Sequence, residues 1–482
     1  MTARLRRIPL PLVVFLALAA LQGVAWAIAT APLDGPDESA HVSYAQNLAE
    51  RGKAPSFTEG NGTESAEVAN ALSWVMLRPT VSEGNVRPAS SSADEAAWNA
   101  FEKTLPPSAK ENGSGPNAVA KNPPLYYLWE SVPYLIAKGA PVFDRLFVMR
   151  LGNVLLFMGT VLFAWLAAAE LFPDLWRRSA VCGFVALQPQ LAFMGGVLNP
   201  DTLLTMIWTA FFFAGLRLLL RGPNFWRVFA LLGIVVASAL TQGRGLPLLG
   251  AGAFVLLLAL WRHRPVRLPS LAGVGAGAAL AGAAWLVYQA TLGAGKRAYT
   301  GEIAFHSAHK FSLWELISQS WQFYLPRLPG MREMLGPTWY GARQLWVETF
   351  WGDFGSLDVH YGGQIYDVVQ AALLSLLVGV LVGLIVRRRD VRWDVVAFLT
   401  ITAALLVAFL HLASYRNLLG SNDPLLVGRY LLPLLAPIAI AVVFVFDLLP
   451  PRLAVYGMTG VLALEAYLGL SGLGLSLTRF YG

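Results

Sequence analysis

The chain has 482 residues, of which 56% are hydrophobic and 13% charged, and its mean hydropathy is +0.54. This composition excludes a soluble globular protein and indicates one polytopic membrane domain over residues 1–482. The single cysteine, Cys182, excludes an intrachain disulfide and a cysteine-based metal cluster. The net charge of +7 does not indicate nucleic-acid binding, because the basic residues lie between hydrophobic runs and report topology instead.

A basic N-terminus precedes the first apolar run. Arginines at positions 4, 6 and 7 lead into apolar residues over 8–28, and a helical span needs about 20 such residues. A signal peptide is the alternative, but Pro32 directly follows the small residues where cleavage would be expected. We therefore predict a retained first span with a cytoplasmic N-terminus.

A cluster of ionisable residues follows this span. Asp34, Asp37, Glu38 and His41 lie within eight residues. Asp34 before a Gly-Pro pair is a helix-start signal, so we predict a helix over 38–51 that begins just after it. Asp37, His41 and Tyr44 then lie on one face of this helix. An acidic cap on a surface helix is the alternative to a functional cluster.

The region 31–143 is mostly polar and is predicted to be a large loop on the outer face. A short helix is expected over 93–103. Near the end of the loop, Lys121-Asn122-Pro123-Pro124-Leu125-Tyr126-Tyr127 leads into a short apolar run. This run is shorter than a typical transmembrane helix, and its Tyr and Trp residues are typical of a helix at the membrane interface.

The arginine clusters decide the topology. If the segment after Lys121 lies in the interface, the basic connectors fall on the cytoplasmic side, as the positive-inside rule requires. The stretch 293–365 then becomes a second outer loop, with a helix expected over 311–325. The eleven predicted spans are 8–28, 145–171, 178–198, 202–220, 225–241, 246–261, 269–292, 366–386, 394–413, 429–447 and 453–475.

Unusual polar residues fall on the same predicted side as Asp37. Asn199-Pro200-Asp201 starts the fourth span, Arg244 stands in a Gly-flanked turn after the fifth, and Arg429-Tyr430 starts the tenth. Arginine is well suited to bind a phosphate group, because its planar guanidinium can donate two parallel hydrogen bonds to the phosphate oxygens. The alternatives are a helix cap for Asp201 and an interfacial anchor for Arg244.

A metal site is a further alternative. Glu38 and His41 could share a divalent ion with a histidine of the second loop, which contains His306, His309 and His360. These histidines lack helical ligand spacing, so we assign no metal ligand and no certain cofactor.

Carboxylates and arginines gathered at one face of a membrane bundle suggest chemistry on an anionic lipid-linked substrate. A carboxylate can take a proton from an acceptor hydroxyl while arginines hold a phosphate leaving group.

These motifs, in this order, resemble the GT-C superfamily of polytopic glycosyltransferases, which includes protein O-mannosyltransferases and aminoarabinose transferases. The resemblance covers about the first 250 residues. The motifs that carry it are the Asp37-Glu38 pair followed by His41 and Tyr44, Pro123 to Tyr127, Met149 to Asn153, Gln188-Pro189, Asn199 to Asp201, and the basic turn at Arg244. Gly428-Arg429-Tyr430 is shared with some bacterial relatives.

The resemblance implies an all-α bundle of about eleven transmembrane helices with two outer loops that carry short amphipathic helices. It implies an inverting transfer of a sugar from a polyprenyl-phosphate donor to a glycan, lipid or protein acceptor of the cell envelope. The enzyme would lie among the lipids of a bacterial inner membrane with its active site on the outer face.

The resemblance also implies residue roles. Asp37 would be the general base with Glu38 as its competitor, Asp201 would position the acceptor or a metal, and Arg244 would hold the donor phosphate. Relatives often place His or Lys where this chain has Asn122, and Lys where it has Arg244. The implied substrate-binding residues are His41, Tyr44, Lys121, Asn122, Tyr126, Asn199, Arg244, Arg429 and Tyr430.

Two other classes stay open. A polysaccharide ligase or polymerase with a lipid-pyrophosphate donor would use arginines and a histidine of a late loop, and Arg327, Arg332 and His360 are candidates. A non-catalytic transporter of lipid-linked glycans would need charged residues inside the spans, whereas the acids here lie at span ends.

Overall fold

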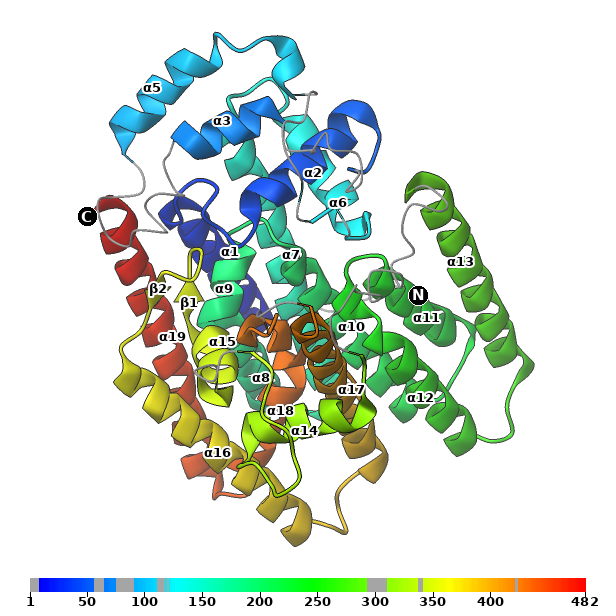
Figure 1. The fold of residues 1–482 in the computed structure, drawn as a ribbon. Coiled ribbons are helices and arrows are strands. Elements are labelled where there is room, and N and C mark those ends of the chain that lie inside the picture. The colour runs from blue at the N-terminus through cyan, green and yellow to red at the C-terminus, as the bar shows by residue number, and fades with distance from the viewer. Residues whose placement is uncertain are drawn as a thin grey trace.

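The computed structural model describes residues 8–55, 65–74, 91–110, 117, 119–120, 122–292, 310–336, 341–420 and 424–482. Within these ranges the protein is almost entirely helical, and its two strands form one short hairpin (Figure 1). The chain is an all-α membrane protein, as the composition predicted.

The elements fall into two groups. Short helices between the first two spans form a helical cap, made of the described helices between residues 38 and 136, at one end of the bundle (Figure 1). The helices of the cap are α2 (Glu38–Arg51), α3 (Ala66–Trp74), α5 (Ser92–Glu102), η1 (Pro107–Lys110) and α6 (Leu125–Ile136). The long helices of the bundle are α1 (Leu10–Ala29), α7 (Val142–Leu171), α10 (Pro200–Arg221), α12 (Pro247–Arg262), α13 (Leu268–Leu292), α16 (Gly363–Val386), α17 (Trp393–Leu418) and α19 (Pro451–Tyr481).

The remaining elements are shorter pieces of spans or parts of the second loop. They are α8 (Leu175–Leu187), α9 (Pro189–Gly195), α11 (Phe225–Ala239), η2 (Gly243–Gly245), α14 (Leu313–Tyr324), the π-helical turn η4 (Arg343–Glu348), α15 (Thr349–Trp351), β1 (Asp353–Phe354), β2 (Val359–His360), η5 (Gly428–Leu434) and α18 (Leu435–Phe446).

Nine helical segments of the described residues are long and apolar enough to cross a membrane. The two other predicted spans are helical as well. One is α11, which has 15 residues, and the other is divided into α8 and α9. The predicted interfacial segment forms the 12-residue α6, which is too short to span a bilayer.

A proline explains the break in the third span. Pro189 cannot donate to the helix backbone, so α8 ends at Leu187 and α9 starts at Pro189. Gln188 caps the new helix through its side-chain oxygen, and its Nε2 donates to the Phe350 carbonyl at 2.6 Å. The break therefore creates a docking point for the second loop.

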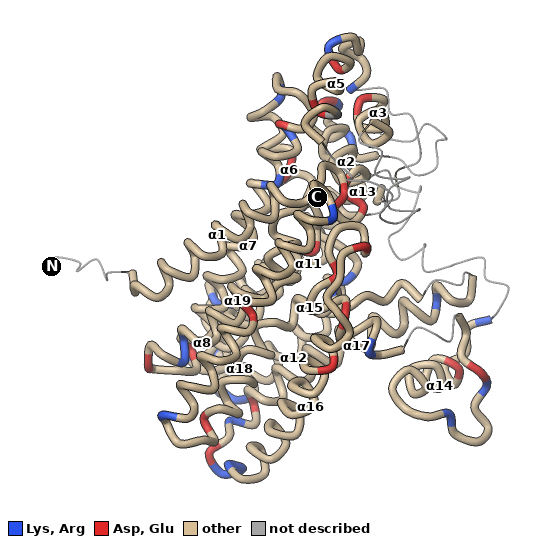
Figure 2. Tube along the Cα trace, turned by 90° about the vertical axis from the view of Figure 1, so that its left-hand side faces the viewer, with Lys and Arg blue, Asp and Glu red and all other residues tan. Residues whose placement is uncertain are grey.

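The connectors predicted to be cytoplasmic lie together at the end of the bundle opposite the cap. Two ion pairs join them: Arg177 with Asp447 (2.9 Å) and Arg262 with Asp394 (2.7 Å). Figure 2 shows charged residues grouped near this end, below α8 and α18, and again around α3 and α5. We call the end of the bundle opposite the cap the arginine-rich end. It consists of the connectors 172–178, 221–227, 262–267, 387–394 and 447–452.

One predicted detail is wrong. Asp34 does not cap α2, because the cap position is Asp37, whose backbone adopts φ 55° and ψ 23°. Asp34 instead accepts a hydrogen bond from Ser356 at 3.1 Å, a residue 322 positions away in the second loop. The sequence signal was local, whereas the partner of Asp34 comes from tertiary packing.

The first prediction concerns sidedness. Cysteines introduced as Arg389→Cys and Gly482→Cys should react with an impermeant maleimide from opposite sides of oriented vesicles, because their helix ends lie at opposite ends of the bundle. The native Cys182 is buried and supplies little background. Labelling of both cysteines from the same side would contradict this arrangement.

Candidate active site

Hydrogen bonds in the turn before α10 hold the backbone of Asp201 in place. Asn199 accepts the Asp201 backbone N–H at 3.0 Å and donates to the Pro36 carbonyl at 3.0 Å. Asn153 of α7 donates to the Met194 carbonyl at 2.9 Å, which holds the preceding turn. The cap at this helix start is therefore Asn199, so the alternative that Asp201 is the helix cap is wrong. The Asp201 side chain is left to make other contacts.

Two arginines converge on Asp201. Its Oδ1 lies 2.6 Å from Arg244 Nη2, and its Oδ2 lies 3.6 Å from Arg429 Nε. The guanidinium carbon of Arg244 lies 3.5 Å from the centre of the Tyr430 ring, and that of Arg429 lies 5.5 Å from it. Residues predicted from three distant turns thus form one cluster, in which Asp201 and Arg429 are buried and Arg244 and Tyr430 are partly buried.

Glu38 has a different environment from Asp37, although the two are adjacent. Its carboxylate binds Arg150 in a two-pronged pair, with Oε1–Nε at 2.9 Å and Oε2–Nη2 at 2.6 Å. It also accepts the backbone N–H groups of Leu198 at 2.9 Å and Gly35 at 3.2 Å. Both oxygens are therefore occupied, and the side chain is buried.

Asp37 is exposed, and no ion pair or hydrogen bond of its carboxylate occurs among the described residues. Its charge nevertheless lies near enough to His41 and Arg429 to interact with both, as does that of Asp201. The charges of Asp37 and Asp201 thus act on the same two groups, His41 and Arg429.

His41 belongs to a buried polar network. Asn122 donates to the Tyr127 hydroxyl at 3.0 Å, and that hydroxyl lies 3.0 Å from His41 Nδ1. The Tyr127 ring stacks on Tyr44 at 3.6 Å, and Tyr44 donates to the Asn122 carbonyl at 3.1 Å. Burial lowers the pKa of His41 to about 4 although Asp37 and Asp201 act in the opposite direction.

The low pKa of His41 makes its imidazole neutral at pH 7, so one ring nitrogen donates a hydrogen bond and the other accepts one. The predicted residue Tyr126 is also buried, and its hydroxyl donates to Asn153 at 3.4 Å.

The second loop contributes a residue that the sequence analysis did not identify. Gln190 exchanges two hydrogen bonds with the Asp353 backbone, each 3.0 Å long. The Asp353 Oδ1 is buried without a hydrogen-bond partner among the described residues. Burial raises the pKa of Asp353 to about 7, against the opposing effect of Arg429. No local motif marks this residue, because its neighbours come from α9 and η5.

Other candidates lie apart from this cluster. Arg327 pairs with Glu333 and Arg332 with Glu315, all within the second loop, and His360 is an exposed residue of β2. Lys121, His306 and His309 lie outside the described residues. Within the described part of the chain, no three His, Cys, Asp or Glu side chains are grouped so as to hold a metal ion.

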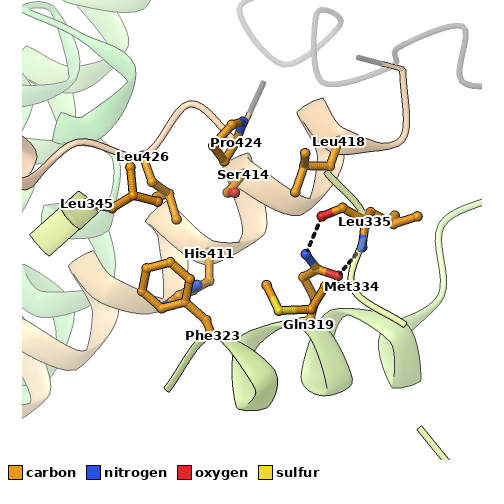
Figure 3. Close-up of a pocket in the computed structure, with 10 residues that line it drawn as sticks. All are labelled: Gln319, Phe323, Met334, Leu335, Leu345, His411, Ser414, Leu418, Pro424 and Leu426. Carbon is orange, nitrogen blue, oxygen red and sulfur yellow. Dashed lines mark hydrogen bonds between the residues drawn. The ribbon is translucent and has the colours of Figure 1, made fainter. Parts of the chain in front are cut away.

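A cavity of about 20 Å³ lies between α14 and α17 (Figure 3). Gln319 closes one side through two 3.0 Å hydrogen bonds to the Leu335 backbone. His411 lines the other side and bonds Tyr324 at 2.8 Å. This space holds about one water molecule. The helix α14 confirms the helix predicted over 311–325.

The second prediction concerns the buried ion pair. Glu38→Gln should destabilise the protein by about 3–5 kcal/mol, because it leaves the Arg150 guanidinium buried without its counter-charge. Thermal unfolding in detergent measures the effect. Glu333→Gln is the matched control, since the Glu333 side chain is 87% exposed. Equal unfolding temperatures of the two variants would contradict a structural role for Glu38.

Two crystal structures of ArnT from Cupriavidus metallidurans are similar to this chain. The apo form matches with a TM-score of 0.49 and 13% identity, over 97% of this chain and 75% of that one. The form bound to undecaprenyl phosphate matches with a TM-score of 0.47 and 13% identity, over 97% and 76%.

The apo crystal structure of an oligosaccharyltransferase from Archaeoglobus fulgidus matches with a TM-score of 0.47 and 12% identity, over 97% of this chain and 55% of that one. ArnT and the oligosaccharyltransferase are both GT-C glycosyltransferases. At these TM-scores the similarities carry no argument about activity, and the proposals below depend on the site itself. No curated protein sequence matches the chain. The family model described as "Predicted membrane protein (DUF2142)" matches residues 20–438, and the chain belongs to this family.

Proposed function

We propose that this protein is an integral-membrane glycosyltransferase. It would move a sugar from a polyprenyl-phosphate donor to an acceptor hydroxyl of the cell envelope, with inversion at the anomeric carbon. The observation that carries the proposal is the convergence of Arg244 and Arg429 on Asp201, close to the exposed carboxylate of Asp37. The GT-C resemblance of the sequence motifs supports the same reaction.

The arginines are suited to the donor phosphate. Arg429 is 9% exposed, and its Nε makes no hydrogen bond among the described residues. Asp201 engages one nitrogen of Arg244 and lies 3.6 Å from Arg429, so most of their donor groups stay available. Asp201 is the only carboxylate at ion-pair distance from Arg244 and Arg429 among the described residues, so a phosphate diester could bind the remaining donor groups of both guanidiniums.

Asp37 is suited to the general base. A base must reach the acceptor hydroxyl, and Asp37 is the exposed carboxylate of the cluster, whereas both oxygens of Glu38 are bound by Arg150 and backbone N–H groups. In the proposed step Asp37 takes the hydroxyl proton while the acceptor oxygen attacks the anomeric carbon. The bond from that carbon to the phosphate oxygen breaks, and the arginines hold the departing phosphate.

Asp201 and Glu38 have positioning roles in this proposal. Asp201 fixes the directions of Arg244 and Arg429, and Glu38 fixes the backbone next to Asp37 through Arg150 and Leu198. No step is assigned to a metal ion.

The site would face the outside of a bacterial inner membrane. The arginine-rich end lies opposite the cap, and the positive-inside rule assigns such connectors to the cytoplasm. A lipid-linked donor would then enter from the membrane, and the acceptor from the aqueous side.

The third prediction tests the base. Asp37→Asn should reduce sugar transfer from a polyprenyl-phosphate sugar by about 10²–10⁴-fold, because the amide cannot accept the hydroxyl proton. Asn also tolerates the left-handed backbone at this position, so the fold should be kept. Asp367→Asn, at a side chain that is 61% exposed, is the control. Near-normal transfer by Asp37→Asn would exclude Asp37 as the base.

The fourth prediction tests the phosphate site. Arg244→Gln and Arg429→Gln should each weaken equilibrium binding of a short polyprenyl phosphate by about 10–100-fold, since a charge-assisted hydrogen bond contributes roughly 1.5–3 kcal/mol. Arg332→Gln is the control, because its side chain is 82% exposed and pairs with Glu315. If all three variants bind equally well, the arginines do not hold the donor phosphate.

A further inference from the structure

A second basic site lies at the arginine-rich end, away from Asp201. A groove of about 350 Å³ opens between the last turns of α10 and the first turns of α11. The residues that line it are Phe213, Ala214, Arg217, Asn224, Trp226, Arg227 and Ala230. The groove thus combines an apolar floor with two guanidiniums.

The charges of this region are unbalanced. Glu170 binds Arg221 closely, at 2.7 Å, and lies 3.8 Å from Arg217. Arg227 has no carboxylate partner among the described residues, and its Nη1 donates to the carbonyls of Arg221 and Gly222 at 2.7 Å each. The region therefore has three arginines and one carboxylate paired with them, which leaves the groove with excess positive charge.

The neighbouring side chains indicate a lipid and not a soluble anion. Trp226 is 72% exposed beside Arg227, and a tryptophan at the end of a span is typical of the headgroup level of a bilayer. The guanidinium of Arg217 lies 5.5 Å from the Phe213 ring centre, so its stem extends along apolar surface. Basic pockets between transmembrane helices are suited to anionic headgroups.

We propose that this groove binds the headgroup of an anionic phospholipid. Arg217 and Arg227 would hold its phosphate, and Trp226 would lie against the glycerol region. The acyl chains would extend along Phe213, Ala214 and Ala230. This site is separate from the proposed transferase site, so it stands whether or not sugar transfer is shown.

The experiment titrates delipidated protein in detergent with phosphatidylglycerol and measures binding by native mass spectrometry. We expect Arg217→Gln to weaken binding by about tenfold or more, since loss of one charge-assisted contact is of this order. Ala230→Trp keeps every charge but fills the groove, and it should weaken binding equally. An unchanged unfolding temperature in the absence of lipid shows that each variant is folded.

The controls distinguish a specific lipid-binding site from non-specific electrostatic attraction. Arg389→Gln removes an exposed charge at the same end and should leave binding unchanged. Equal losses in Arg389→Gln and Arg217→Gln would overturn the proposal, because they would indicate non-specific electrostatics. Binding of phosphatidylcholine as tight as that of phosphatidylglycerol would overturn it, as would displacement of the lipid by millimolar inorganic phosphate.

Discussion

The ion pair between Glu38 and Arg150 holds together three regions of the chain, residues 27–38, the helix α7 and the turn before α10. Besides Glu38, Arg150 donates to the carbonyls of Ala27, Thr30 and Ala31 at 2.8–2.9 Å. These carbonyls lie at or just beyond the end of α1, where a helix leaves carbonyl groups without partners. Glu38 in turn binds Leu198 in the turn before α10. One buried pair therefore sets the end of α1, the start of α2 and the place of Asp201 relative to Asp37.

The buried and partly buried arginines differ in how many of their N–H groups have a hydrogen-bond partner. Arg150 donates five hydrogen bonds and is 3% exposed, so it has nothing left to offer a ligand. Arg244 and Arg429 share the carboxylate of Asp201, and among the described residues the buried Nε of Arg429 has no hydrogen-bond partner. Burying a cation without a full set of hydrogen-bond partners costs free energy. Such a cation therefore indicates a binding site better than one whose donor groups are all paired. This contrast gives Arg150 a structural role, and it is the reason why the proposed function assigns donor binding to Arg244 and Arg429.

Hydropathy and capping signals predicted most of the helices because these are local properties of the chain. The helix 38–51, the non-spanning segment before 137 and the helical character of all eleven spans follow from composition and turn residues alone. The sequence could also place Asp37, Asp201, Arg244 and Arg429 on one side, through the arginine-rich connectors. It could not distinguish Asp37 from Glu38, since the difference depends on Arg150, 112 residues away from Glu38. Asp353 was missed for the same reason, as Gln190 and Arg429 reach it only in the folded chain.

The left-handed backbone at Asp37 restricts which residues evolution can place there. At φ 55° an Asp, Asn or Gly is tolerated, whereas most other side chains meet a steric cost of roughly 1–2 kcal/mol. Of the three, Asp alone has a carboxylate, so glutamate is a poor substitute in spite of its equal charge. In relatives that keep the fold but lack an acidic residue at this position, we therefore expect Asn or Gly. Under the proposed mechanism, a relative with either residue would lack the general base.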